Sequence, residues 1–178
     1  MTTRHLHILG IDPGGTTGWV LLTVARAAIF ADEEPGILEW DYGELNGPEP
    51  GQSIAIARMA REIQGLDYKT GPAILSEQWD IDPSFKSTDQ ERYSPVRINA
   101  QLQLLDYENR MGDSTLHFQS RSQAFRVTDE RLGHHGLYVE GSKHIRAATK
   151  HAITGLRRAR ESRKFALELW PYPPNGIA

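Results

Sequence analysis

Three residues far apart in the sequence have the types and settings that metal-dependent or acid–base chemistry requires. Asp12 ends an apolar run and is followed by the turn Pro13-Gly14-Gly15. Glu77 ends a second short apolar run, and His144 lies in a C-terminal segment with helical periodicity. A carboxylate at the end of a buried strand is held rigidly, and small turn residues leave its approach open. The alternative is that Asp12 only starts a turn, as Asp-Pro pairs often do.

The C-terminal segment carries two adjoining stripes of residues at helical spacing. One stripe is apolar and is expected to pack on a sheet. The second stripe, about 100° round the helix, would then face the strand-end acids, with an alanine between two histidines. The alternative is that both histidines are surface or half-buried helix residues. The apolar stripe is Ile145, Ala148, Ala152, Leu156 and Ala159, and the second stripe is His144, Ala147, His151 and Gly155.

Composition limits the fold and the kinds of site. The chain has 178 residues, of which 39% are hydrophobic and 24% charged, which is enough for one core but short for two lobes. It contains no cysteine, so disulfides and thiolate zinc sites are excluded and the redox compartment is left open. A bound metal must therefore use carboxylates, histidines or water.

The N-terminus and the apolar stretches indicate a soluble protein. The N-terminus lacks a long apolar segment with a cleavage site, and the stretches 20–24 and 27–30 are too short to span a bilayer. We therefore expect a cytoplasmic protein that has no contact with a membrane.

The charge is unevenly distributed along the chain. The net charge is −3, yet residues 143–164 hold one acid, Glu161, against eight basic residues. Such a stripe on one helix is typical of phosphate binding, although a solvated helix face near a C-terminus can have the same composition. The basic residues are Lys143, Arg146, Lys150, Arg157, Arg158, Arg160, Arg163 and Lys164.

The pattern of the whole chain predicts an α/β fold that opens with an antiparallel meander. A polar loop is expected over 78–94, and the segment 120–141 stays unassigned except for a short helix beginning near 128–132. A Pro-rich tail is expected over 170–178. The predicted strands are 6–12, 16–22, 36–45, 73–77 and 116–119, and the predicted helices are 52–66, 95–111 and 142–168.

This order of elements and motifs resembles the RuvC-type Holliday junction resolvases of the RNase H-like superfamily, especially those of bacteriophages. The resemblance rests on Ile8-Leu-Gly-Ile-Asp-Pro-Gly14 with Gly18, on Ile74-Leu-Ser-Glu-Gln78, and on Gly141-Ser-Lys-His-Ile-Arg-Ala-Ala-Thr-Lys-His-Ala152. It implies an RNase H-like (RuvC-like) mixed five-stranded sheet flanked by helices, in one nuclease domain over 1–169. It also implies hydrolysis of phosphodiesters in branched DNA such as four-way junctions, carried out by a homodimer.

The resemblance also implies roles for the site residues. Asp12, Glu77 and His144 fall on three of the four family positions that hold two catalytic Mg²⁺ or Mn²⁺ ions. Asp12 would bridge the ions, Glu77 would bind one of them, and His144 would be a ligand or orient a water. The basic stripe would contact phosphates through Lys143, Arg146, Lys150, Arg157 and Arg158.

The fourth family position departs from the pattern, because Ala147 stands where the family has an aspartate. Alanine cannot bind a cation. Either the substitution is natural and compensated by Asp80, Asp82 or Glu140, or the chain is an inactivated variant, which we favour because the surrounding motif is intact.

The loop aromatics Trp79 and Phe85 would stack on or wedge between bases, although packing against their own domain is an equal alternative. Two other functions compete with the nuclease. Ala147 is also consistent with a non-catalytic junction-binding protein of the same fold. The stretch 12–18 further resembles the phosphate loop of actin-like ATPases and sugar kinases, but the chain has no room for their second lobe.

Overall fold

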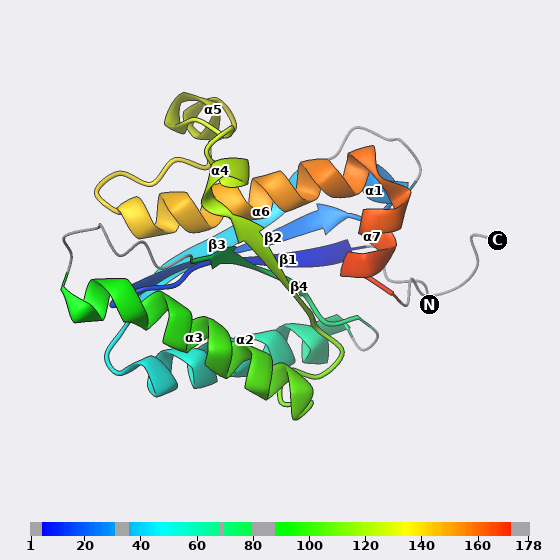
Figure 1. The fold of residues 1–178 in the computed structure, drawn as a ribbon. Helices are drawn as coiled ribbons and strands as arrows, with labels where there is room; N and C mark the ends of the chain where they lie inside the picture. Colours follow the sequence, from blue (N-terminus) through cyan, green and yellow to red (C-terminus); the bar gives the residue numbers. More distant parts are fainter. Residues whose placement is uncertain (1–4, 31–35, 68–69, 80–87, 172–178) are drawn as a thin grey trace.

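The computed structural model describes residues 5–30, 36–67, 70–79 and 88–171, and these form a mixed sheet between two layers of helices (Figure 1). The strand order is β3-β2-β1-β4-β5. The first three strands are antiparallel neighbours, whereas β4 runs parallel to β1 and β5 parallel to β4. The first three strands form the predicted antiparallel meander. Strands β4 and β5 are parallel to β1 and are each reached by a helical crossover connection. The strands are β1 (His5–Asp12), β2 (Thr16–Ala25), β3 (Ile37–Asn46), β4 (Ala73–Gln78) and β5 (Thr115–Ser120).

The helices cover both faces of the sheet. Helices α2 and α3 lie on one face, and α6 crosses the other face together with the shorter α1, α4, α5 and α7 (Figure 1). None of the helices within the described ranges is long and apolar enough to cross a bilayer. The helices are α1 (Ala27–Phe30), α2 (Glu49–Asp67), α3 (Asp89–Tyr107), α4 (Arg121–Ala124), α5 (Asp129–His134), α6 (Lys143–Glu161) and α7 (Arg163–Leu169).

The first strand is buried on both faces, as its apolar residues on alternate sides predict. Leu6 and Ile8 belong to the core cluster under α6. Leu9 and Ile11 belong to the cluster under α2 and α3. Because the strand is clamped from both sides, the backbone that carries Asp12 is fixed by the core.

Glycines let α6 approach the sheet closely. A Cβ at Gly10 would stand 2.9 Å from Ala152 Cβ and 3.0 Å from Val20 Cγ1, and a Cβ at Gly18 would overlap the backbone of His144. Gly155, on the helix itself, would overlap the side chain of Leu75. The short side chains on this face of α6 therefore reach the ends of β1 and β4.

Two predicted helices have different bounds in the structure. Helix α3 begins at Asp89, six residues before the predicted start at Pro95, so the predicted loop is shorter; it ends at Tyr107, four residues before the predicted end. The proline lies inside the helix, where it removes one backbone hydrogen bond. Ser94 and Pro95 are nonetheless buried, and the Ser94 hydroxyl donates to Glu49, which connects this part of α3 to α2.

The predicted helix over 142–168 is two helices that meet at Ser162. This residue has an extended backbone, ends α6, and accepts a hydrogen bond from Phe165 N as the N-cap of α7. The turn lets Phe165, Leu169 and Trp170 enter the core cluster. By contrast, the short helix predicted near 128–132 is confirmed as α5, capped by the Thr128 hydroxyl.

Candidate active site

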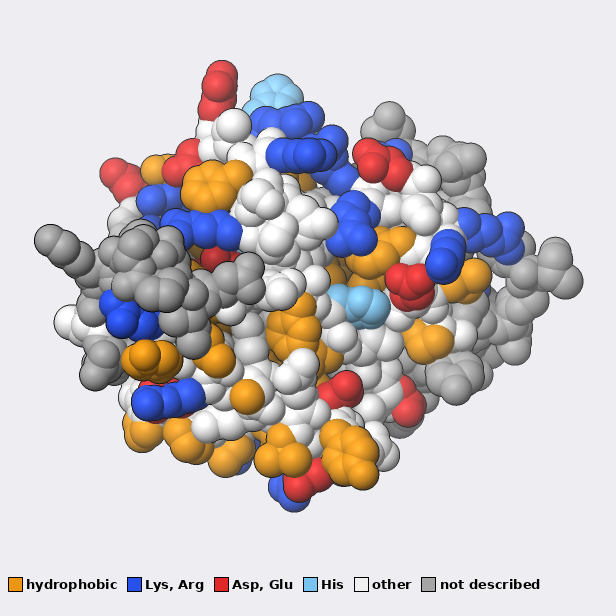
Figure 2. Space-filling model, viewed as in Figure 1, with side chains coloured by type: hydrophobic (Ala, Val, Ile, Leu, Met, Phe, Trp, Pro, Cys, Tyr) orange, Lys and Arg blue, Asp and Glu red, His pale blue; other side chains and the backbone are white. Residues whose placement is uncertain are grey.

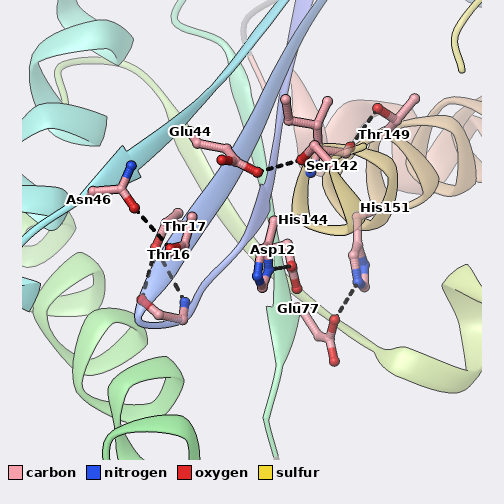
Figure 3. Close-up of polar contacts among 12 residues, drawn as sticks. Asp12, Thr16, Thr17, Glu44, Asn46, Glu77, Ser142, His144, Thr149 and His151 are labelled. Atoms are coloured by element: carbon pink, nitrogen blue, oxygen red, sulfur yellow. Dashed lines mark hydrogen bonds and ion pairs between the residues drawn. The ribbon is translucent and has the colours of Figure 1, made fainter. Parts of the chain in front are cut away.

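An open cavity of about 790 Å³ lies where the ends of β1 and β4 meet the N-terminal half of α6. Since β1 and β4 are parallel, their carboxyl ends share one edge of the sheet, and Asp12 and Glu77 come together there. The predicted residues Asp12, Glu77, His144 and Ala147 all line this cavity, and so does His151. Figure 3 shows the two acids and the two histidines turned toward one another.

Asp12 is paired with His144. The His144 Nδ1 lies 2.8 Å from Asp12 Oδ2, where it donates to the carboxylate. Burial raises the pKa of Asp12, the His144 hydrogen bond opposes this rise, and the nearby Glu77 charge adds to it. Within the described part of the chain, no partner faces the second ring nitrogen of His144. A histidine whose Nδ1 proton is held by a carboxylate is in the tautomer that binds metals through Nε2.

Glu77 is paired with His151, two helical turns after His144. The His151 Nε2 lies 3.3 Å from Glu77 Oε2, and both side chains are almost fully buried. Burial pushes the pKa of Glu77 upward, but the bond and charge of His151, with the charge of Arg121, outweigh it and the pKa is lowered. Glu77 Oε1 is buried and has no hydrogen-bond partner among the described residues.

The donor set suits a hard divalent cation, although it is not assembled as a closed cage. Among the described residues, no three acid or imidazole side chains form a ready-made cation cluster, because each acid is turned to its own histidine. The buried, unpartnered Glu77 Oε1 is the atom that a cation would satisfy. Carboxylate oxygens are the ligands that Mg²⁺ and Mn²⁺ prefer.

Ala147 lies half-buried in the cavity wall, one helical turn after His144. Of the acids proposed to compensate for it, Glu140 is exposed and does not line the cavity, and Asp80 and Asp82 lie outside the described residues. Asp129 is a third acid that does line the cavity, but its oxygens are taken by Arg146 and Lys150.

The remaining wall of the cavity is basic. The Arg146 Nε lies 3.2 Å from Asp129 Oδ2, and the Lys150 Nζ lies 2.5 Å from Asp129 Oδ1. Together with Arg121 and Lys143, these residues give the wall four cations against three acids. Lys and Arg side chains gather over α4, α5 and α6 in Figure 2. An anionic ligand such as a phosphodiester is therefore attracted to the cavity.

The structure divides the predicted basic stripe into two parts. Lys143, Arg146 and Lys150 line the cavity. Arg157 and Arg158 instead line a separate groove of about 290 Å³, together with Arg126 just beyond α4. The Arg158 guanidinium lies 3.9 Å from the centre of the Phe165 ring, which holds it in place.

The two predicted aromatic contacts have different outcomes. Trp79 is half-buried and lines the cavity, beside the acids. Phe85 lies outside the described residues. Phe125, which sequence analysis did not single out, lines the same wall, is exposed, and lies under Arg121.

Three further residues belong to the site, and the motifs did not mark two of them, Gln119 and Asp129. Gln119 pairs with Glu77 across β4 and β5, and its Oε1 lies 3.4 Å from His151 Nδ1. Asp129 opens α5, a segment that carried little periodicity. His151 did fall on the predicted histidine stripe, and only its partner was unknown. For Gln119 the sequence offered no signal, because strand register is not visible in it.

Comparison with known proteins relates the chain to solved structures alone. No family model matches the sequence, and no curated protein sequence does. Thermus thermophilus RuvC in complex with a Holliday junction substrate is 18% identical with a TM-score of 0.56, over 89% of this chain and 97% of that one. Another T. thermophilus RuvC structure is 17% identical with a TM-score of 0.57, over 88% and 96%.

The yeast mitochondrial Holliday junction resolvase Ydc2 is 13% identical with a TM-score of 0.52, over 90% of this chain and 80% of that one. Identities this low show the fold. The chain has the RuvC-like, RNase H-like fold, with the five-stranded mixed sheet that the sequence predicted.

Proposed function

We propose that this chain is a metal-dependent, structure-selective endonuclease that resolves Holliday junctions and related branched DNA. The observation that carries the proposal is the meeting of Asp12, Glu77 and His144 at one basic-walled cavity in a RuvC-like fold. Fold alone does not define an activity, so the proposal depends on the site. The junction bound in the T. thermophilus RuvC complex supports the choice of substrate.

The chain's own residues divide the work between cation binding and substrate binding. Asp12 and Glu77 would hold two Mg²⁺ or Mn²⁺ ions through carboxylate oxygens, and His144 would add its free ring nitrogen. When bound, the ions lower the pKa of a water molecule and neutralise charge on the phosphodiester. Glu77 is buried and the Asp12 side chain is 14% exposed, which limits competition from bulk water for their oxygens.

The basic wall would hold the DNA backbone next to the acids. Asp129 occupies Arg146 and Lys150 in the free protein, as a phosphate would in the complex. Replacing Asp129 by a phosphate would cost less conformational entropy than ordering two free long side chains. The reason is that Arg146 and Lys150 are already oriented by their ion pairs. The groove at Arg126, Arg157 and Arg158 lies two helical turns further along α6 and would bind a second stretch of backbone.

We further propose a homodimer, which matches the two-fold symmetry of a four-way junction. Exposed apolar side chains on α2 and α3 support this, with Ile54 at 53%, Leu104 at 55% and Tyr107 at 90% exposure. Apolar residues lie along the lower edge of the molecule in Figure 2, over these helices. Light scattering of the free protein at micromolar concentration would give a monomer mass if this proposal is wrong.

Ala147 provides the sharpest test of the nuclease function. An aspartate there would add a carboxylate to Asp12 and Glu77 in the wall between the two histidines of α6, one that is not already paired as Asp129 is. Loss of a ligand that contributes several kcal/mol to transition-state charge stabilisation lowers the rate by roughly 10²–10³-fold. We expect the chain with Ala147 to bind junctions but cut them slowly, and Ala147→Asp to raise the rate by that factor.

The assay compares junction cleavage in Mg²⁺ or Mn²⁺ by the chain, by Ala147→Asp, and by Ala147→Asp with Glu77→Gln. The third protein should be inactive, since Gln keeps the shape of Glu77 but cannot provide an anionic ligand. Full activity in the chain with Ala147, or activity that survives the loss of Glu77, would show that the metal site is assigned wrongly.

One observation favours a second function. With Ala147 in the wall, the chain lacks the fourth ligand, which would be its third anionic one, as a non-catalytic junction-binding protein would. In that case Ala147→Asp would bind junctions with unchanged affinity and still leave them uncut in either metal.

A further inference from the structure

His151 is a buried histidine whose presence the packing of α6 does not require. Its side chain is 1% exposed, and its neighbours on the adjoining stripe of α6, Ala148 and Ala152, pack on β1. An apolar residue would satisfy that position at a lower desolvation cost, because a buried polar ring must find hydrogen-bond partners. The partners of this ring are therefore informative.

Both ring nitrogens of His151 lie against polar side chains. Nε2 lies 3.3 Å from Glu77 Oε2, and Nδ1 lies 3.4 Å from Gln119 Oε1. Glu77 and Gln119 are directly paired in the β4–β5 register, so one ring bridges two neighbouring strands. His144 differs, because its bond to Asp12 leaves one nitrogen without a partner among the described residues. The two histidines on this face of α6 are therefore not equivalent.

The backbone around His151 leaves its ring little freedom. One turn further along α6, a Cβ on Gly155 would lie 3.1 Å from Gln119 Nε2 and would overlap Leu75. The helix thus lies against β4 and β5 at closest range just beside the ring. Because the His151 ring is held by β4, β5 and α6, it can in turn hold the side chain of Glu77 in one orientation.

That group is a planar carboxylate, so holding one of its oxygens orients the other. His151 holds Glu77 Oε2, and Oε1 is left buried with no partner in the described part of the chain. An unpartnered buried carboxylate oxygen costs free energy unless a ligand satisfies it. The arrangement therefore sets the direction of the second oxygen of Glu77, with the Asp12 carboxyl group as its acidic neighbour.

We propose that His151 is a positioning residue that holds Glu77 in the orientation required for cation binding, while Gln119 holds the His151 ring. His151 acts from behind the acid and does not contact the cation or the DNA. The inference rests on the proposed metal-dependent function, but it concerns metal binding and can be tested without cleavage.

The experiment is calorimetric titration of Mn²⁺ into the full chain without DNA, in the Ala147→Asp background. His151→Leu removes both polar contacts of the ring, His151→Gln keeps a donor that can reach Glu77, and Thr154→Val is the control. Thr154 is buried on the same helix and its hydroxyl has no partner among the described residues, so its loss tests general disturbance of α6.

We expect His151→Leu to weaken Mn²⁺ binding by roughly 10–100-fold, the usual effect of losing the hydrogen-bond partner of a metal ligand. His151→Gln should recover most of this loss, and Thr154→Val should match the parent. In a Glu77→Gln background, His151→Leu should have no further effect, since the group through which it acts is already changed.

Unchanged Mn²⁺ affinity in His151→Leu would overturn the proposal, and so would equal losses in His151→Leu and His151→Gln. If His151→Leu does not fold, Gln119→Leu replaces it, with a smaller loss expected because Glu77 keeps its direct bond. These results are independent of cleavage: a protein that binds Mn²⁺ in a His151-dependent way but never cuts junctions would refute the proposed function and leave this inference standing.

Discussion

The close approach of α6 to β2 at Gly18 should control both the stability of the fold and the pairing of Asp12 with His144. A Cβ at Gly18 would overlap the carbonyl group of His144 and lie 2.7 Å from Ile145 N. These are backbone atoms of the first turn of α6, which cannot rotate away as a side chain can. Gly18→Ala must therefore push the start of α6 away from the sheet.

The size of the effect follows from the atoms involved. Inserting one methyl group into a tightly packed site costs typically 1–3 kcal/mol, and we expect about 3 kcal/mol here because the contacts are with backbone. For a chain of this length, that lowers Tm by roughly 6–12 °C. Because His144 moves with the helix, its 2.8 Å bond to Asp12 should lengthen and Mn²⁺ affinity should fall by roughly tenfold or more.

Thermal unfolding and Mn²⁺ titration of Gly18→Ala measure both effects, with Gly65→Ala as the matched control. Gly65 lies in α2, and a Cβ there meets nothing within 4 Å. That substitution should raise stability by about 0.5–1 kcal/mol, since alanine favours a helix over glycine. If Gly18→Ala melts within about 2 °C of the parent, or keeps full Mn²⁺ affinity, the close approach of α6 does not position His144.

Two further predictions concern charge. The Lys150 hydrogen bond and the Lys150 and Arg146 charges hold the pKa of Asp129 below its usual value, so its contribution to stability is present above about pH 4 and is lost as pH falls through the lowered pKa. Asp129→Asn should therefore lower Tm by roughly 1–3 °C at pH 7 and by progressively less as the pH falls below about 4, while junction affinity rises; a Tm difference that stays constant as the pH is lowered would contradict this. Arg157→Glu with Arg158→Glu should weaken junction binding and reduce the slope of log affinity against log salt by roughly two, whereas the same change at exposed Arg58 and Arg61 on α2 should not; unchanged junction affinity at moderate salt would mean that the groove only faces solvent.

The parts of the fold that sequence predicted are those in which local pattern and tertiary environment agree. The alternation around Asp12 predicted a strand buried on both faces, and the structure confirms it. The stripe of short residues on α6 predicted which face of the helix meets the sheet, and His144 and His151 both face the acids. In each case the residues repeat with the period of the strand or the helix, so they form one continuous face.

The parts that sequence did not predict depend on contacts between distant elements. The helix break at Ser162 lies between helix-forming residues. It is stabilised because Phe165 and Leu169 pack in the core. The start of α3 before Pro95 depends on the contact of Ser94 with Glu49 on another helix. Gln119 enters the site through strand register. Serine is a preferred N-cap residue, but a single serine does not by itself predict a helix break; the other two features have no local signal, because tertiary packing decides them.

The close packing of α6 on the sheet also explains which side chains on the stripe 144, 147 and 151 can reach the two acids. Gly10 and Gly18 bring the helix axis so near the sheet that a one-carbon stem carries an imidazole to a strand-end acid. A longer side chain would pass beyond those acids or force the helix away. Ala147 lies between the two histidines on that stripe, so an aspartate there would share their short reach to the acids. Three carboxylates in one partly buried cavity repel each other unless cations stand between them. An acid at this position therefore has a role only in a metal-bound site, and with alanine the imidazoles that contact the two acids, among the described residues, are those of His144 and His151.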